Sequence, residues 1–376
     1  MKLAFCLFYF FPYGGQQRDF LKIAEICRER GHSIHVFVMD LQGELPSDYE
    51  LIHLQPRGFS NHSRCRDFAR QVGEQQAIRQ FDVVIGFSKM PGLDVYYAAD
   101  TCYLEKALAD RPFLYRLSGR FRTYAAMEKA VFAPESKAEI LLIAEREQAS
   151  FMRHYGTPAE RFHLLPPGIS RDRIAPANAA EIRRSLREEL GLGGDELLLL
   201  LIGSAFRTKG LDRAMHALAA QPPELRGRCR LCIVGQDKQA PFERLARKLG
   251  ITDRVSFLGG RTDIPRFLLG ADLLLHPAYL ENTGTVLVEA IVAGLPVLAT
   301  EVCGYAGHID KAGAGLLIPA PFEQRTMNEL VTRMLTSDER LAWCRNALAY
   351  ANNADIFSLH QRAADVIESV GSRMAS

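Results

Sequence analysis

Short apolar runs alternate with amphipathic stretches through the first half of the chain. Strand-like runs occupy residues 2–9, 34–39, 82–87, 113–117 and 139–143. The segments between them carry helical spacing, as where Phe20, Ile23 and Cys27 fall on one side of a helix. Strands that alternate with helices are typical of a parallel α/β sheet. The pattern therefore predicts a Rossmann-like domain over residues 1–168.

A second alternating series follows the stiff breaker Pro166-Pro167-Gly168, which suits a domain joint. Its strand-like runs are residues 197–202, 230–234, 255–258, 272–275, 297–300 and 316–318. We expect a second Rossmann-like domain over 169–355 and a helix in 356–376 that packs back across the joint. Ligands of such sheets bind outside the carboxyl ends of the strands. Two facing domains of this kind place the predicted site in an inter-domain cleft.

Composition and residue spacing argue against several classes of protein. Lys and Arg total 46 against 44 Asp and Glu, so the net charge of +2 gives no reason to expect a nucleic-acid partner. Eight scattered cysteines fit reduced cytosolic thiols better than a disulfide framework. Cys229 and Cys232 lie in a strand-like run, where residues three apart point to opposite faces and cannot share a zinc ion. No apolar run approaches the roughly 18 residues of a membrane span.

The segment 281–289 combines two carboxylates with the start of a predicted helix. Glu281 falls in the loop after an apolar strand, and Glu289 falls on the helix that begins near Thr285. The amides of Thr283, Gly284 and Thr285 would then face an anion at the helix N-terminus. The other interpretation is a capping residue followed by an ordinary surface glutamate.

Two other strand ends carry features that suit a phosphate. Gly14-Gly15 follows the first strand, although the dinucleotide fingerprint G-x-G-x-x-G is missing. After the strand at 197–202, Arg207 and Lys209 precede a glycine at a helix start, where they could neutralise a diphosphate leaving group. Taken singly, these cations could equally be solvated surface charges. The segments all belong to strand carboxyl ends, which favours a shared site.

Together these segments resemble the family-four retaining glycosyltransferases of the GT-B fold. The hallmark of that family is a glutamate pair eight positions apart, before a Gly-x-Pro-Val element, here residues 294–297. The stretches 87–100 and 165–169 are more narrowly similar to the lipopolysaccharide core glucosyltransferases, and this similarity extends over nearly the whole chain. The resemblance implies transfer of a hexose from a UDP-sugar to an inner-core heptose of lipid-A-linked oligosaccharide, with retained configuration. Glucose is the first choice, and galactose and N-acetylgalactosamine stay open.

The resemblance also implies roles for individual residues. Glu281 would lie beside the donor sugar, Glu289 would bind the ribose, and Arg207 with Lys209 would hold the diphosphate. The rest of the implied donor site consists of Gly15, Arg173, Arg261, Asn282, Thr283, Gly284 and Thr285. Arg261 would lie near the uracil. The chain departs from the wider family at Ser204, where an arginine is usual, and in the region 115–120, which lacks the usual histidine.

Asp100 and Asp19 are therefore the candidates for handling the acceptor hydroxyl, and a helix-capping role for Asp100 is the alternative. No D-x-D lies against the diphosphate loop and no H-E-x-x-H occurs. We expect catalysis without a metal or another cofactor, because cationic side chains and helix amides can perform the same electrostatic task.

A basic, aromatic stretch between residues 103 and 132 suggests a membrane surface. Its arginines are Arg111, Arg116, Arg120 and Arg122, and no acid interrupts residues 111–124. Such a mixture suits anionic lipid headgroups, so we expect a cytoplasmic protein that is peripheral on the inner membrane. The alternative is a helix that packs its aromatic side chains inward. Other functions left open are transfer to a soluble glycan, a nicotinamide-dependent oxidoreductase and a non-catalytic nucleotide-sugar sensor.

Overall fold

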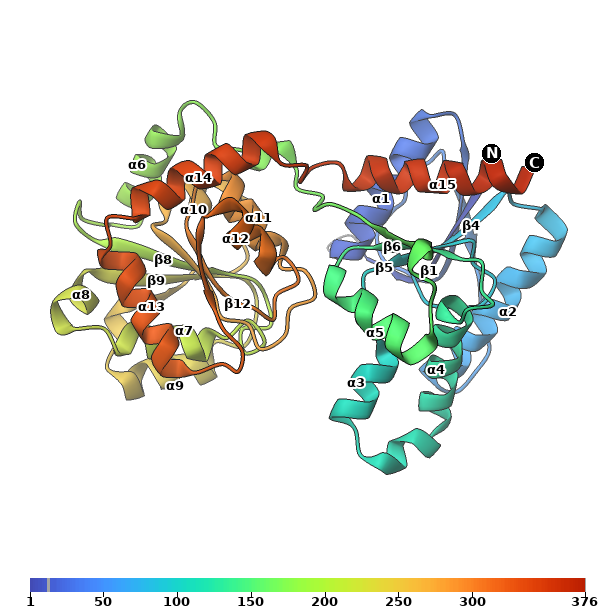
Figure 1. Ribbon diagram of the computed structural model, residues 1–376, viewed down its shortest axis with the longest axis horizontal. Coiled ribbons are helices and arrows are strands. Elements are labelled where there is room, and N and C mark those ends of the chain that lie inside the picture. The colour runs from blue at the N-terminus through green and yellow to red at the C-terminus, as the bar shows by residue number, and fades with distance from the viewer. Residues whose placement is uncertain (12–13, 376) are drawn as a thin grey trace. The chain divides into compact units, whose positions relative to one another are not determined.

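The computed structural model describes residues 1–11 and 14–375, which form two compact units (Figure 1). The first unit combines Met1–Gly168 with Ser358–Ser376, and the second is Ile169–Phe357. The second unit thus ends at Phe357 rather than at the expected residue 355. Each unit is a parallel sheet covered by helices on both faces, which is the expected α/β class.

The first unit contains a seven-stranded parallel sheet with the order β3-β2-β1-β4-β5-β6-β7. Its strands are β1 Lys2–Phe10, β2 Ser33–Leu41, β3 Glu50–His53, β4 Val83–Gly86, β5 Val95–Ala98, β6 Glu139–Leu142 and β7 Phe162–Leu164. Leu3 of β1 pairs with Ile34 on one side and with Val83 on the other. The strand order reverses between β1 and β4, and such a switch point is where α/β sheets bind ligands.

Helices cover both faces of this first sheet. They are α1 Gly15–Glu29, α2 Asn61–Arg79, α3 Tyr103–Asp110, α4 Gly119–Phe132, α5 Glu145–Tyr155 and α15 Leu359–Ala375, with 3-10 turns η1 Phe113–Leu117 and η2 Ala159–Arg161. One core joins Phe5 of β1 to Phe20 of α1 and Ile367 of α15. The opposite core joins the sheet to α2, α4 and α5. The C-terminal helix α15 is therefore an integral layer of the first unit (Figure 1).

The second unit contains a six-stranded parallel sheet with the order β10-β9-β8-β11-β12-β13. Its strands are β8 Leu197–Ile202, β9 Cys229–Val234, β10 Val255–Phe257, β11 Leu273–His276, β12 Val297–Thr300 and β13 Gly315–Ile318. Leu199 of β8 packs into one core and Leu200 into the other. A strand buried on both faces reads as a continuous apolar run, which explains the leucines of β8.

The helices of the second unit also occupy both faces of its sheet. They are α6 Ala179–Glu189, α7 Leu211–Ala219, α8 Pro223–Arg228, α9 Ala240–Leu249, α10 Ile264–Gly270, α11 Thr285–Val292, α12 Ala306–Ala312, α13 Gln324–Thr336 and α14 Arg340–Asn353. Two 3-10 turns, η3 Arg171–Arg173 and η4 Thr252–Arg254, complete it. Helix α11 is the predicted helix of the two-glutamate segment.

One predicted strand is wrong. Residues 113–117 form the 3-10 turn η1 between Pro112 and Ser118. The hydroxyl of Ser118 accepts a hydrogen bond from the amide of Phe121 at 3.1 Å, which caps α4 and ends the turn. Phe113 and Leu114 are 69% and 73% exposed, so this apolar run packs against no sheet. Hydrophobic character alone favoured a strand, but a strand also needs a paired neighbour.

The cysteines of the chain form no disulfide framework. All eight cysteines are free thiols. Cys229 and Cys232 belong to opposite cores of the second unit, as the strand geometry predicts. Within residues 1–11 and 14–375, the structure contains no helix that combines the length and the apolar character needed to cross a membrane.

Candidate active site

The loops after β8 and β11 meet at the carboxyl edge of the second sheet. Gly210, just before α7, has a φ of +77°, and a Cβ added there would lie 2.0 Å from the backbone oxygen of Pro277. Only glycine permits this approach. The contact joins the loop that carries Lys209 to the loop that carries Glu281. Because β8 and β11 are neighbours in the sheet, two side chains 72 residues apart become partners.

Glu281 is the centre of this site. Its carboxylate forms an ion pair with the ammonium of Lys209, and its Oε2 atom lies 3.1 Å from Nε2 of the fully buried His276. Burial would raise the pKa of the Glu281 carboxyl, but the hydrogen bond from His276 and the charge of Lys209 lower the pKa to about 2. Glu281 is therefore an anion at neutral pH, and its side chain is still 13% exposed.

The backbone holds the Glu281 loop against the loop that follows β12. Glu281 forms an isolated bridge with Cys303, and the amide of Tyr305 donates to the oxygen of Thr283 at 2.7 Å. A Cβ on Gly304 would lie 1.8 Å from the oxygen of Asn282, so these two backbones are in direct contact. The loop that presents Asn282 and Thr283 is consequently fixed by the chain itself.

Helix α11 begins directly after this loop. Gly284 is the residue before the helix and has a left-handed φ of +84°, and Thr285 is the first helical residue. The first amides of a helix have no partner inside it and favour an anion at that end. One turn further, Glu289 lies 3.6 Å from Nε of Arg173 in η3. The structure thus brings Arg173 and Glu289 together in one ion pair.

The remaining donor candidates are on neighbouring loops of the same edge. Arg207 is exposed in the loop after β8. Arg261 follows β10, where its guanidinium contacts both carboxylate oxygens of Asp263 at 2.8 Å and lies 5.3 Å from the ring centre of Phe267. The amide of Gly235 donates to the oxygen of Gly259 at 2.8 Å, which links the loops after β9 and β10. Arg261 is therefore held by a local carboxylate.

Two residues of this edge are absent from the predictions made on sequence. His276 is the last residue of β11, and its position between an apolar run and Pro277 is the signal that could have identified it. Arg213 lies 3.5 Å from the ring centre of Tyr279 and 3.7 Å from that of Phe322. It also donates to the oxygens of Pro277 and Ala278, so it fixes the loop that leads to Glu281.

The first unit has a pocket at the carboxyl ends of β1, β4 and β5, with a volume of about 410 Å³. This is the switch point of the sheet. Residues that line it include Tyr9, Ser88, Lys89, Asp100, Tyr103 and Lys106. Asp100 is exposed there and does not begin a helix, because the residue before α3 is Cys102. The pocket therefore offers aromatic rings, cations and one carboxylate to a polar ligand.

Asp19 and Gly15 both belong to α1. The Asp19 carboxylate accepts a hydrogen bond from the hydroxyl of Tyr97 at 2.7 Å and lies 2.9 Å from Nε2 of His360 in α15. His360 is a buried polar residue that sequence reasoning missed. A Cβ added to Gly15 would meet nothing within 4 Å, so packing in the first unit does not require glycine at this helix start. Asp19 is thus a fixed carboxylate, whereas Asp100 is an open one.

The two parallel α/β units and the lysine–glutamate–histidine group at a strand end define a glycosyltransferase of the GT-B class. Residues 182–349 match the family model described as Glycosyl transferases group 1. The chain is 45% identical over 368 residues to the lipopolysaccharide glucosyltransferase WaaG of Escherichia coli strain K12, with 98% of each chain covered. It belongs to the family of WaaG-type lipopolysaccharide glucosyltransferases.

Solved structures agree with this assignment. A crystal structure of WaaG, described as a glycosyltransferase involved in lipopolysaccharide biosynthesis, superposes with a TM-score of 0.87 at 45% identity and covers 97% of this chain and 99% of that one. The Anabaena protein Alr3699/HepE in complex with UDP-glucose gives a TM-score of 0.73 at 20% identity, with 98% of this chain and 100% of that chain covered. At that identity the second likeness supports the fold alone.

Proposed function

We propose that the chain transfers a hexosyl unit, with glucose as the first choice, from a UDP-sugar to an inner-core heptose of lipopolysaccharide with retained configuration. The observation that carries this proposal is the ionised Glu281, paired with Lys209 and His276 beside the start of α11. It occurs in a chain that is similar over nearly its whole length to a lipopolysaccharide glucosyltransferase.

In this proposal the charges of the second unit act on the two halves of the donor. Glu281, an anion at the site, stabilises positive charge that develops on the sugar as the bond to UDP breaks. Lys209 exchanges its contact with Glu281 for the departing diphosphate, and Arg207 adds a second cation there. The amides from Asn282 to Thr285 bind the same phosphates at the start of α11.

The rest of the donor would be bound by neighbouring loops of the second unit. Glu289 accepts hydrogen bonds from the ribose hydroxyls, and Arg173 orients its carboxylate across the 3.6 Å ion pair. Arg261 lies against the uracil. Gly15, the one proposed donor-binding residue of the first unit, would let the phosphates approach α1 closely. We further propose that the reaction needs no metal or other cofactor. Transfer is then expected to continue after treatment with EDTA.

The pocket at the switch point of the first sheet is the proposed site of the acceptor sugar. Aromatic faces such as Tyr9 and Tyr103 suit the apolar face of a sugar ring, while Asp100 and Lys106 suit its hydroxyl groups and substituents. Asp100 would accept the hydrogen of the attacking hydroxyl. Asp19 would act from α1 as a second carboxylate, held in place by Tyr97 and His360.

We propose that the chain works as a peripheral protein on the cytoplasmic face of the inner membrane. The exposed apolar side chains of η1, among them Phe113 and Leu117, lie within the same stretch as Arg111, Arg116, Arg120 and Arg122. Apolar groups that insert and cations that contact headgroups are the combination that holds proteins at anionic interfaces. Some aromatic side chains of the stretch pack against one another, and the ring centres of Tyr103 and Phe121 are 6.1 Å apart.

Flotation with vesicles tests this location. Replacing the four arginines by glutamine should release the chain from phosphatidylglycerol vesicles, and added salt should weaken the binding of the wild type. Replacing Arg226, Arg228, Arg244 and Arg247 of the second unit is the matched control for lost charge. Equal recovery of the wild type on neutral and anionic vesicles would contradict the proposal.

A panel of donors tests the reaction itself. The chain is incubated with UDP-glucose, UDP-galactose or UDP-N-acetylgalactosamine and with lipopolysaccharide truncated at the inner-core heptose, and the product mass identifies the sugar transferred. NMR of the product then gives the anomeric configuration. We expect transfer from UDP-glucose with an α linkage. Transfer to a soluble glycan but to no heptose-terminated acceptor would favour the soluble-acceptor alternative.

A further inference from the structure

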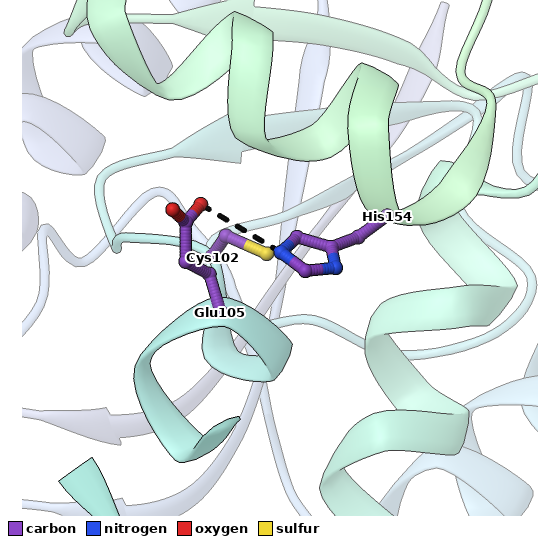
Figure 2. Close-up of side chains that lie close together, drawn as sticks. All are labelled: Cys102, Glu105 and His154. Carbon is purple, nitrogen blue, oxygen red and sulfur yellow. Dashed lines mark ion pairs between the residues drawn. The ribbon is translucent and has the colours of Figure 1, made fainter. Parts of the chain in front are cut away.

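Three side chains with different metal-binding groups converge in the first unit (Figure 2). Cys102 precedes α3, Glu105 is in the first turn of α3, and His154 is in the last turn of α5. One thiol, one carboxylate and one imidazole ligand atom lie within 4.8 Å of one another. Figure 2 shows the sulfur of Cys102 beside the histidine ring and marks the ion pair between the Glu105 carboxylate and that ring.

We propose that Cys102, Glu105 and His154 form a binding site for Zn²⁺. Thiolate, carboxylate and imidazole are the ligands that zinc accepts in proteins. A tetrahedral zinc ion with bonds of about 2.0–2.3 Å holds its ligand atoms roughly 3.3–3.8 Å apart. Glu105 Oε2 and His154 Nε2 are already 3.8 Å apart. Side-chain movements of about 1 Å would bring the remaining ligand atoms to these separations, and a water molecule would occupy the fourth coordination position.

The Glu105 carboxylate supplies an independent observation. Its Oε2 atom is buried and has no hydrogen-bond partner, although buried carboxylate oxygens normally have one. This oxygen is the one that points toward His154. The other oxygen lies 3.3 Å from Nη1 of Arg153, at an exposed position. A cation between Glu105 and His154 would satisfy the buried oxygen without disturbing the arginine.

The electrostatic surroundings favour a cation. Glu147 accepts a hydrogen bond from the amide of Cys102 at 3.0 Å, and Glu128 Oε2 lies 3.6 Å from its sulfur. Two cations are close to the cluster: Lys89 pairs with Glu128, and Arg153 lies 3.3 Å from Oε1 of Glu105. His154 is at the C-terminal end of α5, where the helix dipole attracts positive charge. Two carboxylates beyond the ligands, Glu128 and Glu147, therefore lie next to Cys102, with Lys89 and Arg146 as their own ion-pair partners.

The thiol of Cys102 is suited to a metal and not to covalent chemistry. It is 2% exposed, so dissolved reagents do not reach the sulfur. A bound metal can displace the proton from a coordinating thiol outright. Zinc binding at this site is therefore expected to release a proton.

The metal would connect α3 to α5 beside the first-unit pocket. Asp100, Thr101 and Tyr103 flank Cys102 in sequence and line that pocket. Zinc would thus fix one wall of the proposed acceptor site. The zinc site is separate from the proposed donor chemistry, because Glu281, Lys209 and Arg207 belong to the second unit and the chemistry proposed for them uses no metal.

Metal titration of the full chain tests the site without any activity assay. The chain is treated with a chelator, and Zn²⁺ is then titrated in competition with a chromophoric chelator, for the wild type, Cys102→Ser, Glu105→Gln and His154→Gln. We expect one tight site per chain and at least about a tenfold loss of affinity in each variant, since even outer partners of zinc ligands change affinity by 10–100-fold. Cys344→Ser and His163→Gln are matched controls that should bind like the wild type.

Cobalt identifies the ligands directly. Co²⁺ bound to the wild type should show a thiolate charge-transfer band, and Cys102→Ser should lose that band. If Cys102→Ser fails to fold, His154→Gln still decides the question, because His154 lies at a partly exposed helix end. Equal zinc affinity in the wild type and His154→Gln, or a cobalt spectrum without a thiolate band, would overturn the site. Either result leaves the proposed sugar transfer untouched.

Discussion

Two carboxylates, the buried Asp272 and the partly exposed Glu281, flank strand β11 and have opposite surroundings. Asp272 precedes the strand, is 1% exposed, and contacts Arg183 at 2.6 Å, Arg187 at 3.0 Å and Arg340 at 2.5 Å. Glu281 follows the strand, and Lys209 and His276 contact its carboxylate. Both are carboxylates, yet only one faces the edge where parallel sheets bind ligands.

The difference is in the kind of cation that pairs with each carboxylate. Asp272 also accepts a hydrogen bond from the amide of Leu198 at 2.7 Å, so α6, α14 and β8 all attach to it. Burial would raise the pKa of Asp272, but Arg183 and its other partners lower it. Glu281 instead pairs with a lysine, whose long side chain can move to another anion. Asp272, before the strand, thus stabilises the fold, whereas Glu281, after the strand, pairs with a cation that can move to a ligand.

Among the replacements that test this comparison, Asp272→Asn is expected to have the largest effect, which is a lower free energy of unfolding. The change leaves three arginines facing a neutral amide, and breaking a buried ion pair typically costs about 3–5 kcal/mol in the free energy of unfolding. Trp343, the single tryptophan, is buried in the second unit and reports its unfolding by fluorescence in urea. Asp253→Asn removes an exposed ion pair and serves as the control.

The same network predicts how the stability of the second unit depends on pH. Because the folded-state pKa of Asp272 is lowered, its contribution is fully present above the unfolded pKa of about 3.9 and is lost as pH falls through the folded value. Asp272→Asn should therefore flatten the loss of stability in acid. An Asp272→Asn chain that unfolds at the wild-type urea concentration would show that Asp272 does not stabilise the second unit.

Glu281→Gln should reverse the pattern, with a large effect on transfer and a small one on unfolding. We expect the rate of transfer to fall by about 10²–10³-fold, as when a preorganised transition-state contact is removed. Glutamine keeps the shape and can still accept from His276, so the urea transition seen by Trp343 should move little. The measurement is the initial rate with saturating UDP-glucose, beside UDP affinity from calorimetry.

The pH dependence of this reaction provides a second check on Glu281. Its pKa of about 2 keeps the carboxylate charged throughout the usual assay range. Any loss of rate between pH 8 and pH 5 must then come from another group, and a Glu281 titration near pH 6 would contradict the assignment. Near-normal turnover of Glu281→Gln would remove this residue from the mechanism.

Lys209→Ala tests whether the carboxyl end works by exchange of partners. Without the lysine, departing UDP loses a cation and Glu281 loses its main ion pair, so we expect transfer to slow by about 10²-fold. The pKa of Glu281 should also rise, because the charge of Lys209 lowers it. Lys248→Ala at the end of α9 is the control for a lost surface charge. If Lys209→Ala lowers stability as much as Asp272→Asn does, then this pair is structural as well.

Sequence patterns reveal some of these features because the features are local. The apolar run of β8 and the helical spacing of α11 follow from burial of adjacent residues. Glu281 and Lys209 follow from their positions after strands, whereas the role of Glu289 came from the resemblance to the glycosyltransferase family. Strand β3 was not predicted, because it lies at a sheet edge and most of its side chains are exposed. The turn η1 was mistaken for a strand because apolar character does not show whether a neighbour exists to pair with it.

The missing part of the site depends on the order of strands in the sheet. Lys209 meets Glu281 because β8 lies next to β11, and Arg213 reaches Tyr279 for the same reason. Nothing in the spacing of these residues specifies that order. His360 shows the same limit in the first unit, because its partner Asp19 lies 341 residues earlier in the chain. Long-range pairs of polar groups need the fold before they can be identified.

Glu289 combines features of the two carboxylates, and its replacement is expected to have the smallest effect. Like Asp272 it has an arginine partner in the chain, Arg173 at 3.6 Å, and like Glu281 it belongs to the α11 segment that lies at the ligand edge. Glu289→Ala should weaken UDP binding by about 1.5 kcal/mol, the value typical of a hydrogen bond to a charged group, or roughly tenfold in Kd.

Calorimetry with UDP distinguishes the two possible roles of Glu289, with Glu329→Ala on α13 as an exposed control. If Glu289 mainly binds the ribose, Arg173→Ala should weaken UDP by less than Glu289→Ala does, because the arginine only orients the carboxylate. If the ion pair is structural, both replacements should shift the Trp343 transition equally and leave the affinity of the folded chain for UDP unchanged. That second result would place Glu289 with Asp272 as a structural carboxylate, and exchange of partners would then be confined to Lys209 and Glu281.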